Sequence, residues 1–221
     1  MAKKLITVIF FLAAALSTFA QEARVTEVTG TVEVKNSASG SWESAAVGTV
    51  IGKNTVLSTG IKSSAVISLG SSKVSVGALA MLTLEELTQQ GGTEKTDLLL
   101  RSGRVKADVT PPAGLKAEFT VRSPTTTASV RGTSFTFDGK KLFVHNGQVT
   151  LSNNSGQKVF VNQNQRSYLD SDQHGKVTLP YETETSDARV TFVDTEKTGV
   201  ADKGQKSGSQ KVKVDIDIGW N

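Results

Sequence analysis

Few side chains in this sequence could carry out acid–base, nucleophilic or metal chemistry. The chain contains no cysteine, which excludes disulfide bonds, thiolate nucleophiles and thiolate zinc sites. It has only two histidines, His145 and His174, and neither lies beside a nucleophile motif such as Gly-x-Ser-x-Gly. An active site needs several groups placed in defined mutual geometry. We therefore predict that the protein has no catalytic residues and is not an enzyme.

One acidic segment resembles the beginning of a calcium-binding loop. Asp170, Asp172 and Gly175 follow the spacing Asp-x-Asp-x-x-Gly. The twelfth position of such a loop requires a bidentate glutamate, but here it is Tyr181, and Glu182 comes one residue late. A solvated acidic turn accounts for the same residues. We therefore expect no metal site and no cofactor.

The segments that would position any site are short and alternate apolar with polar residues. Residues 65–69, 74–76, 119–121 and 134–137 show this pattern, with Gly, Ser or Asn at their boundaries. A period of two, enrichment in β-branched residues and a spacing of about 8–12 residues are typical of all-β folds. The sequence therefore predicts many short strands in a sandwich or a solenoid-like β-roll.

The segment 77–90 fits both a helical and a strand period. We predict a strand, because the segment follows the strand-like residues 74–76 and ends at Gly91-Gly92, which indicates a hairpin connection.

A Gly-x-Val-x-apolar pattern occurs three times, beginning at Gly30, Gly103 and Gly147. Each copy follows a turn and opens a predicted strand. Glycine at such a position permits a positive φ or a close approach of two backbones. The copies are 73 and 44 residues apart, so they do not form a regular repeat. They indicate special backbone geometry at three corners.

The N-terminus has the features of an export signal. Lys3 and Lys4 precede an apolar run over residues 5–16, and small residues lead up to Gln21. The run is shorter than the roughly 20 residues that a membrane-spanning helix needs. We therefore expect residues 1–20 to be a cleaved signal peptide. The mature protein would be periplasmic, secreted or on the cell surface of a bacterium, and it would not span a membrane.

The charge balance argues against a nucleic-acid partner. The chain has 25 basic and 21 acidic residues, a net charge of +4. The predicted signal peptide holds two lysines and no acid, which leaves 23 basic and 21 acidic residues and a net charge of +2. Basic residues are scattered and aromatic residues make up only 6% of the chain. Phosphate binding and base stacking need clusters of both.

The composition becomes polar near residue 170. We expect a β domain over residues 21–169 and a polar tail over residues 170–221, with a flexible Gly-, Ser- and Lys-rich linker at 197–210. The last eleven residues alternate strictly. The apolar face of this terminal strand, together with the penultimate tryptophan, comprises Val212, Val214, Ile216, Ile218 and Trp220. Because an uncovered apolar strand face is an aggregation hazard, we expect these residues to contact a partner or the domain itself.

The segment Val-Arg-Ser-Pro-Thr-Thr-Thr-Ala-Ser-Val-Arg-Gly-Thr-Ser-Phe at 121–135 resembles the FecR domain, a family named for the periplasmic regulator of ferric-citrate transport. Leu-x-x-Gly-x-Val around Gly103 and Val-x-x-Gly-x-Val around Gly147 also match, and the resemblance covers about residues 25–165. The motif residues, which we expect to be mainly structural, are Gly103, Ser123, Pro124, Arg131, Gly132, Thr133, Phe135 and Gly147.

The sequence allows two interpretations of the role of Arg131. Its planar guanidinium suits a carboxylate on a ligand or partner. Alternatively, it caps nearby backbone carbonyls while Gly132 permits a tight bend, and this structural reading is the one we favour.

The resemblance implies a non-enzymatic sensing or scaffolding domain that binds a protein partner at the cell envelope. The best-known members carry a cytosolic segment and a transmembrane helix before this domain. We expect neither here, and hence no direct contact with a sigma factor. A cell-wall or polysaccharide-binding module is the alternative, with Trp42 or Trp220 stacking on sugars. We expect Trp42 to pack in the core under the first loop instead.

Overall fold

The computed structural model describes residues 23–36, 40–170 and 175–182. This part of the chain contains strands and no helix, which confirms the all-β prediction. The strands are β1 (Ala23–Thr29), β2 (Val32–Lys35), β3 (Glu43–Ser44), β4 (Val50–Ile51), β5 (Val56–Thr59), β6 (Ser64–Leu69), β7 (Ser72–Val76), β8 (Met81–Gln90), β9 (Thr93–Ser102), β10 (Val105–Asp108), β11 (Lys116–Arg122), β12 (Thr126–Val130), β13 (Ser134–Phe137), β14 (Lys141–Asn146), β15 (Gln148–Asn153), β16 (Lys158–Asn162), β17 (Gln165–Asp170), β18 (Lys176–Val177) and β19 (Tyr181–Glu182).

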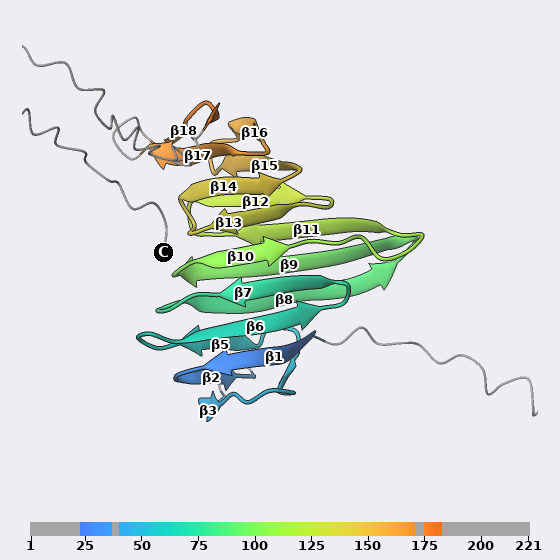
Figure 1. Ribbon diagram of the computed structural model, residues 1–221, viewed down its shortest axis with the longest axis vertical. Coiled ribbons are helices and arrows are strands. Elements are labelled where there is room, and N and C mark those ends of the chain that lie inside the picture. Colours follow the sequence, from blue (N-terminus) through green and yellow to red (C-terminus); the bar gives the residue numbers. More distant parts are fainter. Residues whose placement is uncertain (1–22, 37–39, 171–174, 183–221) are drawn as a thin grey trace, which may run out of the picture. The chain divides into compact units, whose positions relative to one another are not determined.

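The strands form two large sheets (Figure 1). Sheet A has the order β18-β17-β14-β13-β10-β7-β6-β1-β4, with β19 also pairing with β17. Sheet B has the order β16-β15-β12-β11-β9-β8-β5-β2-β3. From β5 onward, both sheets add their strands in sequence order, so the chain advances steadily from one end of each sheet to the other.

The chain builds the sheets by crossing between them after nearly every hairpin. The hairpins β6–β7 and β13–β14 lie in sheet A, while β8–β9 and β15–β16 lie in sheet B. Strands β9 and β11 are the exception to antiparallel pairing, because only the single strand β10 crosses to sheet A between them and the chain returns in the same direction. This stacking of successive hairpins matches the predicted solenoid-like roll.

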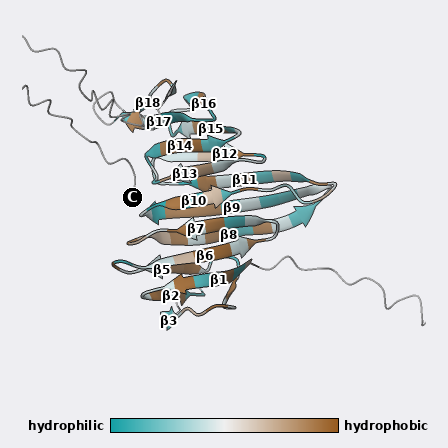
Figure 2. Ribbon diagram, viewed as in Figure 1, coloured by the Kyte–Doolittle hydropathy of each residue, from teal (hydrophilic) through white to brown (hydrophobic). Residues whose placement is uncertain are grey.

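The core lies between the two sheets because side chains along each strand point alternately inward and outward. In β11, Ala117, Phe119 and Val121 are buried, while the residues between them face solvent. Figure 2 shows the same alternation of hydrophobic and hydrophilic residues along the strands. Phe135 and Phe137 are fully buried in the same core.

The three glycines of the Gly-x-Val pattern lie where the chain passes from one sheet to the other. Gly30 joins β1 to β2, Gly103 joins β9 to β10, and Gly147 joins β14 to β15. Their φ angles are +69°, +80° and +86°, a region that L-residues with a Cβ rarely adopt. At Gly103 a Cβ would also lie 2.4 Å from the Cα of Ala80. The shared pattern therefore marks one kind of corner, used three times.

The segment at 77–90 is a strand over most of its length, as predicted, because β8 begins at Met81 and runs to Gln90. After residue 169, β18 and β19 both pair with β17, and Val177 is buried. Sheet A therefore extends beyond the boundary that composition suggested. The predicted signal peptide, His174, the linker at 197–210 and the terminal strand, with Val212, Val214, Ile216, Ile218 and Trp220, lie outside the described residues.

Candidate functional site

The first half of the FecR-like motif forms the turn between β11 and β12 and ties the two sheets together. The Ser123 hydroxyl donates to the carbonyl of Gly139 at 2.7 Å and accepts a hydrogen bond from the Thr126 N–H at 3.0 Å. The Thr126 hydroxyl donates to the same Gly139 carbonyl at 2.6 Å. Pro124 lies at the tip, where its carbonyl accepts from Asn154. These hydrogen bonds hold the sheet B hairpin against the β13–β14 turn of sheet A.

The second half of the motif forms the corner between β12 and β13. Thr133 is buried, and its hydroxyl donates to the carbonyl of Gln148 at 3.0 Å. Its backbone N–H and carbonyl pair with Val109. A Cβ on Gly147 would lie 2.9 Å from the Thr133 hydroxyl oxygen. The β14–β15 corner therefore needs glycine at residue 147 to lie close to the β12–β13 corner. Gly147 is thus packed against the corner that contains Gly132 and Thr133.

The remaining motif residues have packing roles. Phe135 is fully buried in the core. A Cβ on Gly132 would lie 3.3 Å from the ring of Pro111 in the β10–β11 connection, so this glycine allows a close approach.

Arg131 differs from its motif neighbours. It is exposed and, within the part of the chain that the structure describes, makes no hydrogen bond or ion pair. The expectation that it caps nearby carbonyls is therefore wrong. The corner bends the backbone so that Thr133 turns inward while Arg131 stays on the outer face of sheet B. The corner thus presents a guanidinium that has no partner among the described residues.

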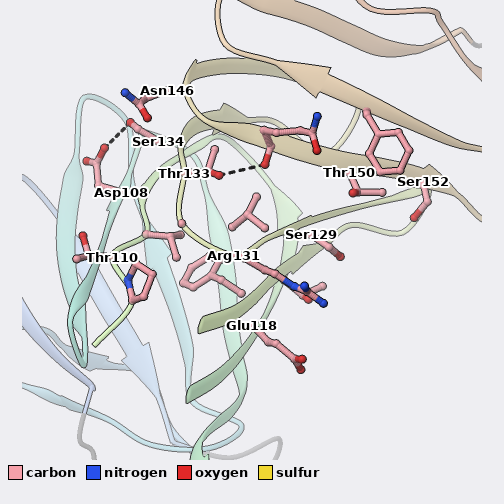
Figure 3. A pocket seen from close by; sticks show the side chains of 18 of the residues that line it. Asp108, Thr110, Glu118, Ser129, Arg131, Thr133, Ser134, Asn146, Thr150 and Ser152 are labelled. Atoms are coloured by element: carbon pink, nitrogen blue, oxygen red, sulfur yellow. Dashed lines mark hydrogen bonds between the residues drawn. The ribbon is translucent and has the colours of Figure 1, made fainter. Parts of the chain in front are cut away.

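Arg131 lines a groove of about 1220 Å³ on the outer face of sheet B (Figure 3). The floor consists of outward-facing residues of β11, β12, β15 and β16, and one wall is the β10–β11 connection. The register places Thr120 opposite Ser129, Ser129 opposite Thr150, and Thr150 opposite Phe160. Three hydroxyls and one aromatic ring therefore form a single row across four strands.

The charges of the groove are few and of both signs. Glu118, Arg131 and Lys158 line it and have no ion-pair partner among the described residues. Asp108, at the rim, accepts a 2.5 Å hydrogen bond from Ser134 and lies 3.9 Å from Lys106. A groove without a dominant positive charge does not favour a densely charged polyanion such as nucleic acid.

Sheet B has a second cluster of charged residues beside the groove, on β8 and β9. The Lys95 ammonium lies 2.5 Å from a carboxylate oxygen of Glu86 and 3.2 Å from one of Asp97. The hydrogen bond from Lys95 lowers the pKa of Glu86 below its ordinary value, and Glu86 in turn raises the pKa of Lys95. Lys95, Glu86 and Asp97 form ion pairs with one another, so we do not expect them to bind a ligand in the groove.

The expectation that Trp42 packs in the core is wrong. Trp42 is 42% exposed and not part of the core, and the Lys35 ammonium lies 5.9 Å from its ring centroid. It precedes β3, at the opposite end of sheet B from β16. An exposed ring is what the polysaccharide-binding alternative requires.

Among the described residues, His145 contacts a hydroxyl group and an aromatic ring. Its Nε2 lies 2.8 Å from the hydroxyl of Thr136, and its ring packs edge-on against Phe143 at 4.7 Å. The nearby carboxylate of Asp108 bonds Ser134 instead, so it does not orient the imidazole as a triad would require. The described residues contain no cluster of three or more His, Cys, Asp or Glu side chains that could hold a metal.

The environment of His145 predicts a pH-dependent stability. Burial lowers the pKa of the imidazole and the positive charge of Lys106 lowers it further, against a smaller opposing effect of Asp108. Below the ordinary pKa of about 6.5, the unfolded chain therefore takes up the proton more readily than the folded protein. Stability is retained above that pH and lost as pH falls.

We expect His145→Gln to flatten this dependence between about pH 8 and pH 5. The difference is expected to stay below about 1 kcal/mol, because water screens a partly exposed charge. Urea unfolding at several pH values measures it. Parallel curves for both proteins would contradict the prediction.

The comparisons with known proteins agree with the motif. The family model described as FecR protein matches residues 55–150. Residues 55–150 are therefore similar to the FecR domain. The match covers the strands from β5 to the first half of β15, including Arg131 and its corner, but not Lys158 or Phe160. This similarity supports a signalling or sensing role.

Solved structures give a more distant similarity. Two crystal structures of a "putative anti-sigma factor" from Parabacteroides distasonis each show 16% identity and a TM-score of 0.47. Each comparison covers 57% of this chain and 59% of that protein, so the similarity spans under two thirds of its length. No curated protein matches this chain. The described residues include no helix of the length and apolarity needed to cross a bilayer.

Sequence reasoning missed most of the groove. It singled out Arg131 but not Thr120, Ser129, Thr150 or Phe160. These residues alternate outward along their strands, which is visible in the sequence. Their assembly into one row depends on pairing between strands far apart in the chain.

Proposed function

We propose that this protein is a non-enzymatic sensing or scaffolding module of the bacterial cell envelope that binds a protein partner through its FecR domain. The observation that carries the proposal is that some motif residues fix the backbone, whereas one motif side chain faces solvent. Hydrogen bonds of Ser123, Thr126 and Thr133 fix the backbone, while Arg131 is exposed and has no hydrogen-bond or ion-pair partner among the described residues. A preformed surface with a free arginine is typical of binding sites, in which arginine is enriched.

The location and a second contact are part of the same proposal. The features of residues 1–20 support export to the periplasm or the cell surface. The alternating terminal segment at 211–221 supports a contact by strand addition, because its apolar face and its polar face are fully separated.

Affinity capture tests the proposal. The mature chain (21–221), tagged at its N-terminus, is incubated with envelope extract, and bound proteins are identified by mass spectrometry. We expect one stoichiometric protein whose capture is weakened by Arg131→Gln and lost on deletion of residues 211–221. Arg101→Gln is the matched control, because Arg101 is exposed but does not line the groove. Capture that is unchanged by both changes, or no stoichiometric protein at all, would overturn the proposal.

A cell-wall or polysaccharide-binding module is the second candidate function. The exposure of Trp42 favours it, because a solvent-facing indole can stack on a sugar. A pull-down on insoluble peptidoglycan distinguishes the two functions. Retention that is lost in Trp42→Ala would support the second candidate, and no retention would exclude it.

A further inference from the structure

We propose that the groove on the outer face of sheet B is a binding site for an acidic polysaccharide, a sugar chain that carries carboxylate groups. The inference goes beyond partner binding and does not depend on it. It rests on three features of the groove: its polar floor, its exposed aromatic ring and its two cations, which have no ion-pair partner in the part of the chain that the structure describes.

The floor suits a ligand with many hydroxyl groups. Thr120, Ser129 and Thr150 lie in one row, and Ser152 lies next along β15. Neighbouring strands are about 4.8 Å apart, so hydroxyls recur along the row at a spacing close to the length of one sugar ring. Each hydroxyl both donates and accepts a hydrogen bond, as the hydroxyls of a sugar do.

The aromatic ring lies at the end of the hydroxyl row. Phe160 is 62% exposed, although a phenylalanine on an outer sheet face gains nothing from facing water. It is opposite Thr150 and lines the groove. The C–H groups on one face of a sugar ring carry partial positive charge and pack against the negative face of an aromatic ring. A sugar stacked on Phe160 would therefore continue along Thr150 and Ser129.

The two cations define the charge of the ligand. Arg131 and Lys158 line the groove without ion-pair partners among the described residues, and the groove has one comparably unpaired acid, Glu118. Arg131 offers a planar fork of donors that fits a carboxylate with two hydrogen bonds. Strand spacing and rise per residue place its Cα roughly 16 Å from that of Lys158. Two separated cations with hydroxyls between them match a chain with spaced carboxylates better than a dense polyanion.

The size of the groove agrees with a chain and not with a single sugar. Its volume of about 1220 Å³ exceeds the range of about 300–1,000 Å³ that is usual for small-molecule pockets.

The test uses a short oligogalacturonate as probe and its methyl-esterified form as the matched neutral ligand. Isothermal titration calorimetry with the mature chain should give binding to the acid form. Affinity should weaken with added salt, because exposed charges are screened. The esterified form should bind at least about tenfold more weakly, because it lacks the charge-assisted hydrogen bonds. No binding of the acid form, or equal binding of both forms, would overturn the inference.

Variants locate the site. Arg131→Gln and Phe160→Ala should each reduce affinity by about tenfold, whereas Arg101→Gln should not change it. Circular dichroism shows whether each variant is folded. Independently of the variants, NMR titration of the unaltered protein should shift amide signals of β12, β15 and β16. Shifts confined to the β2–β3 end of sheet B would overturn the assignment to the groove.

The outcomes separate this inference from the proposed function. Glycan binding in calorimetry without a stoichiometric protein in the capture experiment would leave the groove assignment intact and contradict the proposed function. If Arg131→Gln and Phe160→Ala abolish capture of a protein and leave glycan affinity unchanged, the groove is a protein-docking surface, and the polysaccharide inference is wrong.

Discussion

Replacing Gly103 with alanine is expected to destabilise the domain by about 3 kcal/mol or more. Two costs add. A φ of +80° is unfavourable for a residue with a Cβ, by about 1–2 kcal/mol. In addition, the new Cβ would lie 2.4 Å from both the Cα and the Cβ of Ala80, so the backbone of the β7–β8 connection has to move. Overpacking of this kind costs a further 1–3 kcal/mol or so.

Gly114→Ala is the matched control for this prediction. Gly114 has a similar φ of +75°, but a Cβ there would meet nothing within 4 Å. Gly114→Ala should therefore lose stability only through the unfavourable φ angle. The reduced entropy of the unfolded chain partly offsets this loss. Urea denaturation measures both variants. The prediction is wrong if the two substitutions cost the same, because the close approach to Ala80 would then contribute nothing.

Phe135→Ala is expected to cost about 3–5 kcal/mol of unfolding free energy, by lost burial and by the cavity that it leaves. Phe135 is fully buried and is paired with Ala107 on one side and Val144 on the other, at the centre of sheet A. No neighbouring backbone is free to collapse into the space, because β10 and β14 are themselves paired on both sides.

Phe160→Ala removes the same side chain from an exposed position and should change stability by less than about 0.5 kcal/mol. We therefore expect Phe135→Ala to affect stability and Phe160→Ala to affect ligand binding. Thermal unfolding of both variants measures the contrast. A large loss of stability in Phe160→Ala would show that this ring packs against the domain, and its assignment to the groove would then need another explanation.

The alternation of residue types along the chain was sufficient to predict the strands and the all-β class. Segments such as 65–69 and 134–137 place every second side chain in the core, and burial of apolar surface selects the same faces in the folded protein. Glycine at residues 30, 103 and 147 predicted special corners, because few other residues tolerate a positive φ. These features depend on residues that are close together in the chain, so the sequence alone was enough to predict them.

Contacts between distant segments decided the rest. Trp42 is exposed, and Arg131 caps no carbonyl of the described residues, because the positions of both depend on how corners and sheet ends pack. The row from Thr120 to Phe160 joins residues 40 positions apart in the sequence, and only strand register brings them together. A shift of one residue in any of these pairings would turn one strand's side chains into the core and break the row. The amino-acid sequence by itself therefore determined which side of each strand faces water. The pairing of the strands decided which of those water-facing side chains meet to form a groove, because register is a property of the whole sheet.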